Sequence, residues 1–331
     1  MRMPPLMTPV ELPKPAPRVV PTTRFVLLGS CFATHIGARL RAAGMRTEVN
    51  PFGVLYNPKS IALAIEALLD GVVRDDWFFE GRDGLWHSWL HATEYSAPNK
   101  ESCRKRVEER LVTAREMLMH ADILCLTFGT NRVYEHAGRV VSNCHKEPAS
   151  KFIERSLTTA EITERWCHIL KRLTAYNPKL EIVFTISPYR YAKYGFIENQ
   201  RAKATLLLAV DEILKQEQLA SNGRQTNENS AVYYFPAYEI LLDELRDYRF
   251  YAEDMLHPSE QAVNIIWQRF VTWAFTKEAE TFAQEWERTE RDLAHRPMNP
   301  DSEAHKAFLA KVMERRKLLE TKNKLQFSTE K

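Results

Sequence analysis

The chain has 331 residues, of which 44% are hydrophobic and 27% are charged, and its formal net charge is +3. That length suits one large α/β domain with an appendage or two ordinary domains, and the composition is typical of a globular protein. Because the charges nearly balance, nothing in the composition indicates a nucleic-acid partner or an anionic membrane surface.

Residues 1–23 are predicted to form an extended N-terminal segment, rich in proline and basic residues and lacking the apolar stretch of a secretory signal. No apolar run approaches the roughly 20 residues that a transmembrane helix needs. The five cysteines are scattered and odd in number, which does not suit a disulfide framework. We therefore expect reduced thiols, no membrane partner and a cytoplasmic location.

From residue 24 to 275, strand patterns alternate with helical periodicity, as a parallel sheet requires. The predicted strands are 25–28, 47–50, 123–128, 180–186 and 231–235. The predicted helices are 34–43, 58–69, 100–120, 159–175, 198–218 and 258–275. We interpret this region as a single catalytic domain whose ligand site lies at the carboxyl ends of the strands.

The segment 70–99 interrupts this alternation and is rich in aromatic side chains. Two interpretations remain open. These residues either pack beneath a long loop or form a lid over the site that offers a platform to a sugar or an apolar group. The aromatic and histidine residues concerned are Trp77, Phe78, Phe79, Trp86, His87, Trp89 and His91.

Two short motifs supply the groups of a serine nucleophile. Ser30 follows the first predicted strand, and Asp254 and His257 lie far downstream. A serine hydroxyl needs a neutral imidazole to take its proton and a carboxylate to fix the tautomer of that imidazole. Taken alone, each motif is more often structural, because Ser30 suits a helix cap and Pro258 suits the first turn of a helix.

An acyl-transfer site also needs two or three N–H donors that converge on the oxyanion. Gly53 permits close backbone approach to a ligand, and Asn131 follows the third predicted strand with a side-chain amide. We predict an oxyanion hole formed by the backbone N–H groups of Ser30 and Gly53 and by the Asn131 amide.

Ser30, Gly53, Gly129-x-Asn131 and Asp254-x-x-His257 resemble, in order, the four sequence blocks of the SGNH or GDSL hydrolase superfamily. The stretch Gly29-Ser30-Cys31-Phe32-Ala33 resembles more narrowly the signature of the GSCFA family. Segments 140–146, 187–190 and 234–239 are also similar to that family. The resemblance implies a three-layer α/β/α sandwich with a mainly parallel sheet and a serine esterase-type site.

Cys31 is an alternative nucleophile, because a thiolate beside a helix N-terminus is activated by the helix dipole. The superfamily pattern favours Ser30. Three more polar residues, Asn143, His145 and Arg190, are candidates for binding substrate from loops near the same face. Loop stabilisation explains Asn143 and His145 equally well, and a structural salt bridge explains Arg190 somewhat better. The Cys-His pairs lack the spacing of zinc ligands, so we predict no metal and no cofactor.

Beyond residue 275 the chain becomes rich in Glu, Lys and Arg, with a proline-containing break at 296–300. We predict a charged helical extension over 276–331, made of two helices that either dock on the main domain or pair with another subunit. Its acids balance its bases, which argues against nucleic-acid binding.

We predict a serine esterase that cleaves a short acyl group from a small molecule or a carbohydrate through an acyl-enzyme. The carbohydrate rests on superfamily analogy alone. Two alternatives remain: an O-acyltransferase that uses the same site, and a non-catalytic scaffold that keeps the fold.

Overall fold

The computed structural model describes residues 7–222, 232–298 and 302–325. Its main sheet has five strands, all parallel: β1 (Arg24–Gly29), β2 (Arg46–Val49), β5 (Ile123–Phe128), β9 (Glu181–Ile186) and β10 (Val232–Phe235). Their spatial order is β10-β9-β5-β1-β2. The order reverses between β1 and β5, and this topological switch point is where open α/β sheets bind ligands.

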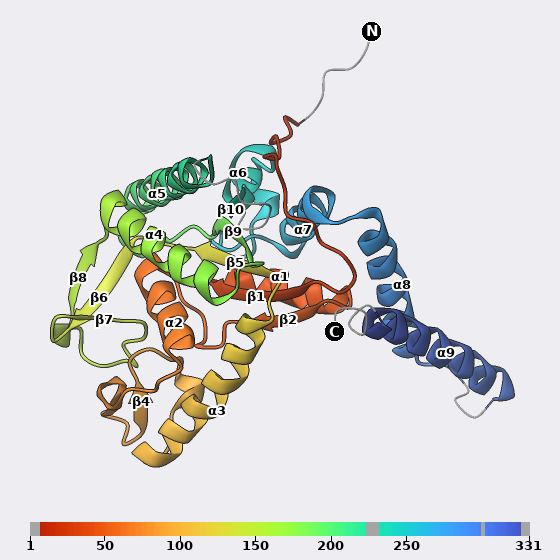
Figure 1. Cartoon of the computed structure of the whole chain (residues 1–331), viewed down its shortest axis with the longest axis horizontal. Helices are drawn as coiled ribbons and strands as arrows, with labels where there is room; N and C mark the ends of the chain where they lie inside the picture. The colour runs from red at the N-terminus through yellow and green to blue at the C-terminus, as the bar shows by residue number, and fades with distance from the viewer. Residues whose placement is uncertain (1–6, 223–231, 299–301, 326–331) are drawn as a thin grey trace, which may run out of the picture.

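Side chains of the strands alternate between two apolar clusters, one on each face of the sheet. In β1, Val26 and Leu28 join the first cluster, whereas Phe25 and Leu27 join the second. The first is covered by α2 (Pro58–Asp70), α3 (Lys100–Met119), α4 (Thr159–Tyr176) and α5 (Phe196–Asn222). The second is covered by α1 (Cys31–Ala42), the short α6 (Ala237–Glu239) and α7 (Glu260–Ala274). Figure 1 shows these helices on the two sides of the sheet, which makes three layers.

The predicted fold class is therefore confirmed, and each of the five predicted strands lies within two residues of an observed one. The largest difference at a helix start is in α1, which begins at Cys31 and not at residue 34. The cause is Ser30, whose Oγ accepts a hydrogen bond from Phe32 N–H at 3.3 Å and so caps the helix.

Two small antiparallel sheets were not predicted. The hairpin of β3 (Phe78–Glu80) and β4 (Trp86–Ser88) lies within the aromatic segment. A second sheet, made of β6 (Arg132–His136), β7 (Arg139–Val141) and β8 (Ile153–Ser156), follows β5. Strands of three to five residues are too short to show a clear alternation in sequence.

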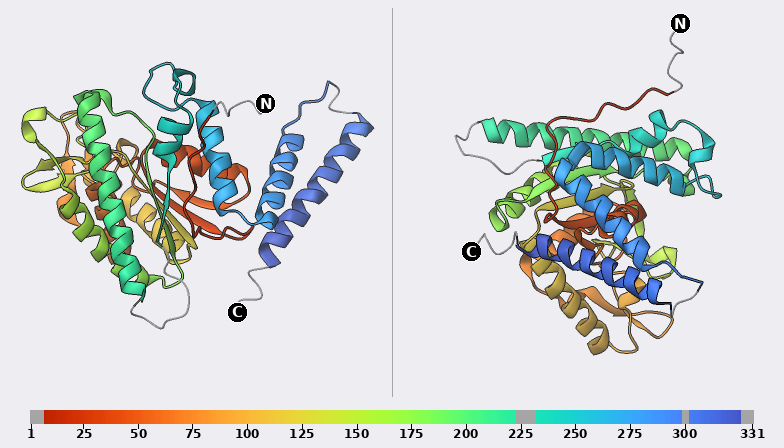
Figure 2. Two further views of the ribbon diagram at one scale, coloured as in Figure 1. Left: turned by 90° about the horizontal axis from the view of Figure 1, so that it is seen from above. Right: turned by 90° about the vertical axis from the view of Figure 1, so that its right-hand side faces the viewer.

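The two predicted C-terminal helices are observed as α8 (Lys277–Leu293) and α9 (Glu303–Leu325). They run side by side and project from the three-layered body (Figures 1 and 2). Phe282 of α8 and Leu319 of α9 are buried in the second apolar cluster, which ties the pair to the sheet domain. No helix among the described residues is both long and apolar enough to cross a membrane.

Candidate active site

A tight turn joins β1 to α1 and sets the position of Ser30. Gly29 has φ of +148°, and a Cβ atom there would lie 2.3 Å from the carbonyl oxygen of Thr127 on β5. The turn therefore requires glycine. It puts Ser30 at the carboxyl end of β1, beside β5, with only 1% of its surface exposed.

Asp254 and His257 form a hydrogen-bonded pair in the loop before α7. The distance between His257 Nδ1 and Asp254 Oδ2 is 2.5 Å, and Asp254 Oδ1 accepts the backbone N–H groups of Leu256 and His257 at 2.9 Å each. These hydrogen bonds, that from the His257 side chain first, lower the pKa of Asp254 to about 2. The carboxylate is thus ionised near neutral pH and fixes the tautomer of His257.

Ser30 and His257 do not hydrogen-bond to each other in this structure. The Ser30 hydroxyl contacts Ser187 Oγ at 2.9 Å, and Nε2 of His257 has no hydrogen-bond partner among the described residues. The two residues are linked through Tyr189, whose ring packs on His257 with centroids 4.3 Å apart and whose N–H lies 3.4 Å from Ser187 Oγ. The three predicted triad residues thus lie at one edge of the sheet, but no hydrogen bond joins Ser30 to His257.

The three predicted oxyanion donors all have acceptors within the protein. Gly53 N–H donates to Asn50 O at 2.8 Å, and Ser30 N–H donates to Thr127 O at 3.3 Å. One amide hydrogen of Asn131 goes to Leu157 O at 2.9 Å, while its Oδ1 is buried without a partner among the described residues. Their part in an oxyanion hole remains a prediction that requires these donors to exchange acceptors when substrate binds.

A cavity of about 980 Å³ opens next to this site. Gly53, Tyr56 and Thr130 line its near end, and Tyr56 O accepts the N–H groups of Gly129 and Thr130. A Cβ atom at Gly129 would lie 3.7 Å from the Cβ of Ser30, which brings this wall close to the nucleophile. The other lining residues are mainly aromatic, polar or charged, among them Thr93, Arg132, Tyr134, Asn143, Phe152, Glu154, Tyr191 and Lys193.

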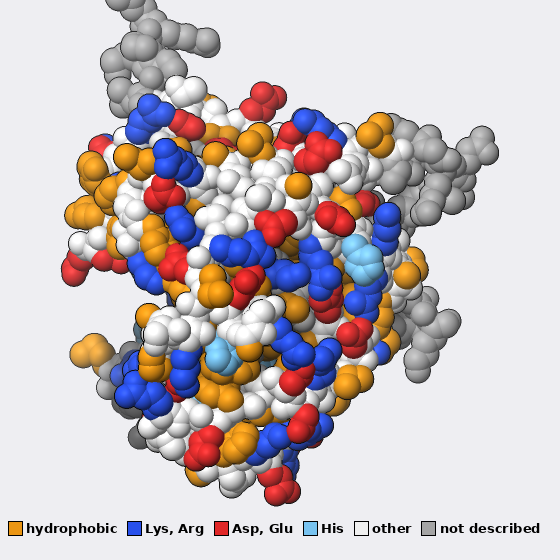
Figure 3. Space-filling view, turned by 90° about the vertical axis from the view of Figure 1, so that its left-hand side faces the viewer, with side chains coloured by type: hydrophobic (Ala, Val, Ile, Leu, Met, Phe, Trp, Pro, Cys, Tyr) orange, Lys and Arg blue, Asp and Glu red, His pale blue; other side chains and the backbone are white. Residues whose placement is uncertain are grey.

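The face of the molecule that carries β6, β7 and β8 has Lys and Arg interspersed with Asp and Glu, without a large area of one sign (Figure 3). Around the cavity, Arg132 is paired with Glu198 at 2.8 Å and also faces Glu154 at 3.8 Å. Lys193 donates to the hydroxyl of Tyr134. The lining includes three basic side chains, Arg41, Arg132 and Lys193, and three acidic ones, Glu94, Glu147 and Glu154, so it has no excess of either sign. This balance suits a neutral polar ligand better than a strongly charged one.

The segment 70–99 packs both on itself and on residues of the segment that follows β5, and one edge of it forms part of the cavity wall. Phe79 and Trp89 stack with centroids 3.5 Å apart. His91 is buried, and burial lowers its pKa to about 3. The residues that reach the cavity are Ala92, Thr93 and Glu94. Phe78 is buried, whereas Trp77, Phe79, Trp86 and Trp89 are partly exposed, so both interpretations of the aromatic residues stay predictions. The edge at 92–94 is a side wall of the cavity.

Of the three candidate substrate-binding residues, only Asn143 lines the cavity, and its Oδ1 accepts the N–H of His145 at 2.8 Å. His145 is buried, and its Nε2 lies 2.8 Å from Ser88 O. Arg190 donates to Met255 O at 3.0 Å, with its guanidinium 4.2 Å from the centre of the Phe196 ring. The polar groups of His145 and Arg190 make contacts within the protein, and their part in binding substrate stays a prediction.

Cys31, the alternative nucleophile, is half-buried, and burial is the main cause that raises the pKa of its thiol. A protonated thiol is a weak nucleophile, which favours Ser30. All five cysteines are free in this structure. No group of three or more His, Cys, Asp or Glu side chains suited to a metal ion occurs in the part of the chain that the structure describes.

The family model described as the GSCFA family matches residues 24–270, and the model for the GSCFA domain protein, C-terminal domain, matches residues 286–331. The chain belongs to the GSCFA family. The predicted resemblance is thus confirmed.

Three solved structures that are similar to this GSCFA chain are esterases. A carbohydrate esterase family 3 protein from Talaromyces cellulolyticus has 10% identity and a TM-score of 0.35 over 80% of this chain and 99% of its own. The acetyl xylan esterase Est2A from the rumen bacterium Butyrivibrio proteoclasticus has 10% identity and a TM-score of 0.36, and the match covers 77% of this chain and 63% of Est2A. Scores this low assign no function. No curated protein matches the chain.

Three residues of the GSCFA site have contacts that the sequence did not reveal. Ser187 contacts Ser30, Tyr189 contacts His257, and Lys203 donates from α5 to the carbonyls of Gly129 and Ser187. The segment 187–190 stood out only by its resemblance to the family. Lys203 gave no signal, because a lysine in a helix is ordinarily exposed.

Proposed function

We propose that this GSCFA protein is a serine esterase of the SGNH type. Ser30 is the nucleophile, His257 the general base, and Asp254 the carboxylate that orients the imidazole. The bond formed is an ester between Ser30 Oγ and the acyl carbon, and the bond broken is that to the leaving alcohol. His257 takes the Ser30 proton and gives it to that alcohol, and water later releases the acid.

The hydrogen-bonded pair of Asp254 and His257 carries this proposal. Asp254 accepts three hydrogen bonds, and the 2.5 Å contact directs Nδ1 of His257 toward the carboxylate. The opposite nitrogen, Nε2, is then the one available to accept a proton, and 43% of the His257 side chain is exposed. A purely structural loop does not need an oriented imidazole at the sheet edge that carries Ser30.

The chemical step requires His257 to reach Ser30, so the proposal includes a local rearrangement. Ser30 Oγ has to turn from Ser187 toward His257, or the loop at 252–258 has to move past Tyr189. Catalytic hydrogen bonds are often long or unformed without substrate and tighten when it binds. A ligand-bound structure with Ser30 Oγ within about 3.2 Å of His257 Nε2 is the expected outcome.

The proposed substrate is a short acyl ester on a carbohydrate. The cavity beside Ser30 offers aromatic faces from Tyr56, Tyr191 and Phe152 together with amide and hydroxyl groups. Aromatic faces with nearby hydrogen-bonding groups suit a ring that carries hydroxyls. Its volume of about 980 Å³ is large enough for an acceptor alcohol. Transfer of the acyl group to a sugar is therefore the second candidate function.

The test is labelling with a serine-directed fluorophosphonate, followed by a panel of acetylated sugars. We expect labelling at Ser30 that is lost in His257→Ala, and acetate release that is lost in Ser30→Ala. Labelling that persists in Ser30→Ala and disappears in Cys31→Ser overturns the choice of nucleophile. Absence of labelling and of hydrolysis in the wild type favours the scaffold. Faster formation of acylated sugar than of free acid favours the transferase.

A further inference from the structure

The Ser30 hydroxyl has two hydrogen-bond partners within the described chain, and the closer is Ser187 Oγ. In this structure Ser30 donates to Ser187 Oγ at 2.9 Å and accepts the Phe32 N–H at 3.3 Å. The Ser187 hydroxyl can donate in return once the Ser30 proton has left. Ser187 is fully buried, comes directly after β9, and its N–H donates to Phe128 O at 2.8 Å. Because this bond continues the pairing of β5 and β9, the Ser187 hydroxyl is held by rigid backbone against the nucleophile.

Lys203, on α5, hydrogen-bonds to the backbone on which Ser187 lies. Its Nζ donates to Ser187 O at 2.7 Å and to Gly129 O at 2.8 Å, and it thus joins the ends of β9 and β5. Only 1% of Lys203 is exposed. Among the described residues no carboxylate forms an ion pair with it, while the Tyr238 ring lies 5.4 Å from its Nζ.

A buried lysine without a counter-ion costs stability, so its position calls for a reason. Burial lowers the pKa of Lys203 to about 7. An amine has two N–H groups and an ammonium has three, so both carbonyls remain satisfied in either protonation state. The contacts of Lys203 with Ser187 and Gly129 are therefore independent of its charge near neutral pH.

We propose that Ser187 is a further catalytic residue, whose hydroxyl donates a hydrogen bond to Ser30 Oγ when negative charge develops there, and that Lys203 is the residue that positions Ser187. This inference rests on the proposed esterase function. Charge develops on Ser30 Oγ as its proton passes to His257 and again as the acyl-enzyme bond breaks. Ser187 keeps its own proton throughout, so no further acid or base is needed.

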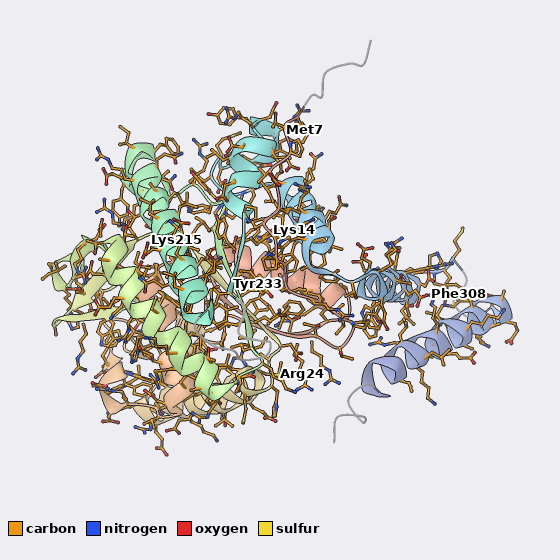
Figure 4. All side chains as sticks on the ribbon, turned by 45° about the horizontal axis from the view of Figure 1, so that its top comes forward. Met7, Lys14, Arg24, Lys215, Tyr233 and Phe308 are labelled. Carbon is orange, nitrogen blue, oxygen red and sulfur yellow. The ribbon has the colours of Figure 1, made fainter. Side chains whose placement is uncertain are left out.

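The structure allows the catalytic and the structural part of Ser187 to be separated. Ser187→Ala keeps the backbone N–H that pairs with Phe128 and the carbonyl that accepts from Lys203, and it removes only the hydroxyl. Lys203→Met keeps an unbranched side chain that is one atom shorter, and it removes the donors. Lys215→Met is the matched control, because Lys215 lies on the same helix, its side chain is 60% exposed and it pairs with Asp211 (Figure 4).

The experiment measures kcat and KM with p-nitrophenyl acetate, the rate of fluorophosphonate labelling of Ser30, and the melting temperature. We expect Ser187→Ala to lower kcat and the labelling rate by about 10- to 100-fold, with KM within about twofold, as for the loss of one transition-state donor. Lys203→Met should show the same split, and Lys215→Met should match the wild type. The double variant should be no slower than the slower single variant, because Lys203 acts through Ser187.

Several outcomes overturn the inference and are distinct from failure of the esterase function. A wild type that is neither labelled nor active ends the proposed function itself. If the wild type is labelled and Ser187→Ala has the same kcat and labelling rate, Ser187 has no catalytic role. A double variant whose losses multiply ends the positioning role of Lys203. If Lys203→Met does not fold, Ser187→Ala and Ser187→Cys, which keeps a weaker donor and should be intermediate, still decide the role of Ser187.

Discussion

At the scale of single residues, the site combines an exposed hydrogen-bonded pair, Asp254 and His257, with a buried lysine, Lys203. Asp254 lies at the surface, and its ionised state is secured by three hydrogen bonds. Lys203 lies inside the protein, where burial weakens its hold on a proton. The exposed Asp254 orients His257 at little cost in solvation. Burial of Lys203 lowers the free energy of unfolding, which can be measured directly.

Replacing Asp254 by Asn should lower kcat by about 10³- to 10⁴-fold, because an amide no longer fixes the His257 tautomer with Nε2 as acceptor. Steady-state kinetics with an acetyl ester measure this. Asp247→Asn is the control, since Asp247 is also an exposed aspartate and accepts the backbone N–H of Arg249 in its own loop. Equal activity of Asp254→Asn and the control would contradict the assigned role.

The pKa of Lys203 predicts how stability changes with pH. Its folded pKa of about 7 lies below the ordinary value of 10.5, so between these values the unfolded chain binds a proton that the folded chain does not. The free energy of unfolding should therefore rise with pH across this window through Lys203, and Lys203→Met should lack that rise. Urea denaturation of the wild type and Lys203→Met at pH 7 and pH 10 measures their free energies of unfolding. The same difference between the two proteins at both pH values would refute the prediction.

At the scale of elements, two connections place the chemistry. The glycine turn between β1 and α1 fixes Ser30, and the segment 187–190 after β9 connects Ser30 to the loop that carries His257. Arg190 completes that connection, since its backbone N–H donates to Leu256 O at 3.0 Å and its guanidinium to Met255 O. Met255 has φ of +58°, an uncommon conformation for a residue other than glycine, and this bond helps to hold it.

Removing that support with Arg190→Met should lower kcat about tenfold or more and leave KM nearly unchanged, because a displaced imidazole affects the chemical step more than binding. Arg201→Met is the control, as Arg201 is exposed and pairs only with Glu198 among the described residues. A rise in KM at constant kcat would instead favour the substrate-binding role predicted from the sequence.

The turn before Ser30 should not accept a side chain. Gly29→Ala puts a Cβ atom 2.3 Å from Thr127 O, so we expect a loss of several kcal/mol or failure to fold. Gly84→Ala is the control, because Gly84 also has positive φ, +76°, but has no atom within 4 Å of the added Cβ. The control should lose only about 1 kcal/mol, from backbone strain alone. Thermal melting of both variants measures their losses of stability, and the difference between the two losses is the contribution of the steric clash.

At the scale of the whole molecule, the C-terminal helices are joined to the second apolar cluster and lie apart from the cavity beside Ser30. Leu319 of α9 is buried with Phe282 of α8, and Arg315 of α9 pairs with Asp292 of α8. Phe308, labelled in Figure 4, lies near the N-terminal end of α9 on the projecting part of the pair. These contacts favour docking on the domain within one chain. They do not address pairing with another subunit.

Leu319→Ala should lower the free energy of unfolding by about 2–4 kcal/mol, because it leaves a cavity in a cluster shared with the sheet. The neighbouring Leu318→Ala should change it little, since Leu318 is 60% exposed and Leu319 only 3%. Chemical denaturation measures both. Fluorophosphonate labelling of Ser30 in the folded state should match the wild type in each variant, and a selective loss in Leu319→Ala would connect α9 to the site.

The sequence by itself determined the order of strands and helices, the fold class and the family. A short continuous apolar run such as 123–128 is typical of a strand that is buried on both faces, and its length of six residues favours a strand over a helix. Motifs such as that around Ser30 are local in the chain. The strands of the two small sheets were too short to be predicted. The sequence also brought Ser30, Asp254 and His257 together as one hypothesis, because parallel strands all end at one edge.

Only the tertiary structure decided which groups touch. Ser187 meets Ser30 across 157 positions of sequence, and Lys203 reaches the carbonyls of Gly129 and Ser187 from a helix on one face of the sheet. The same packing directed His145 to Ser88 and Arg190 to Met255, away from the cavity. Hydrogen bonds act over about 3 Å and depend on the direction of each side chain, and long-range packing sets that direction.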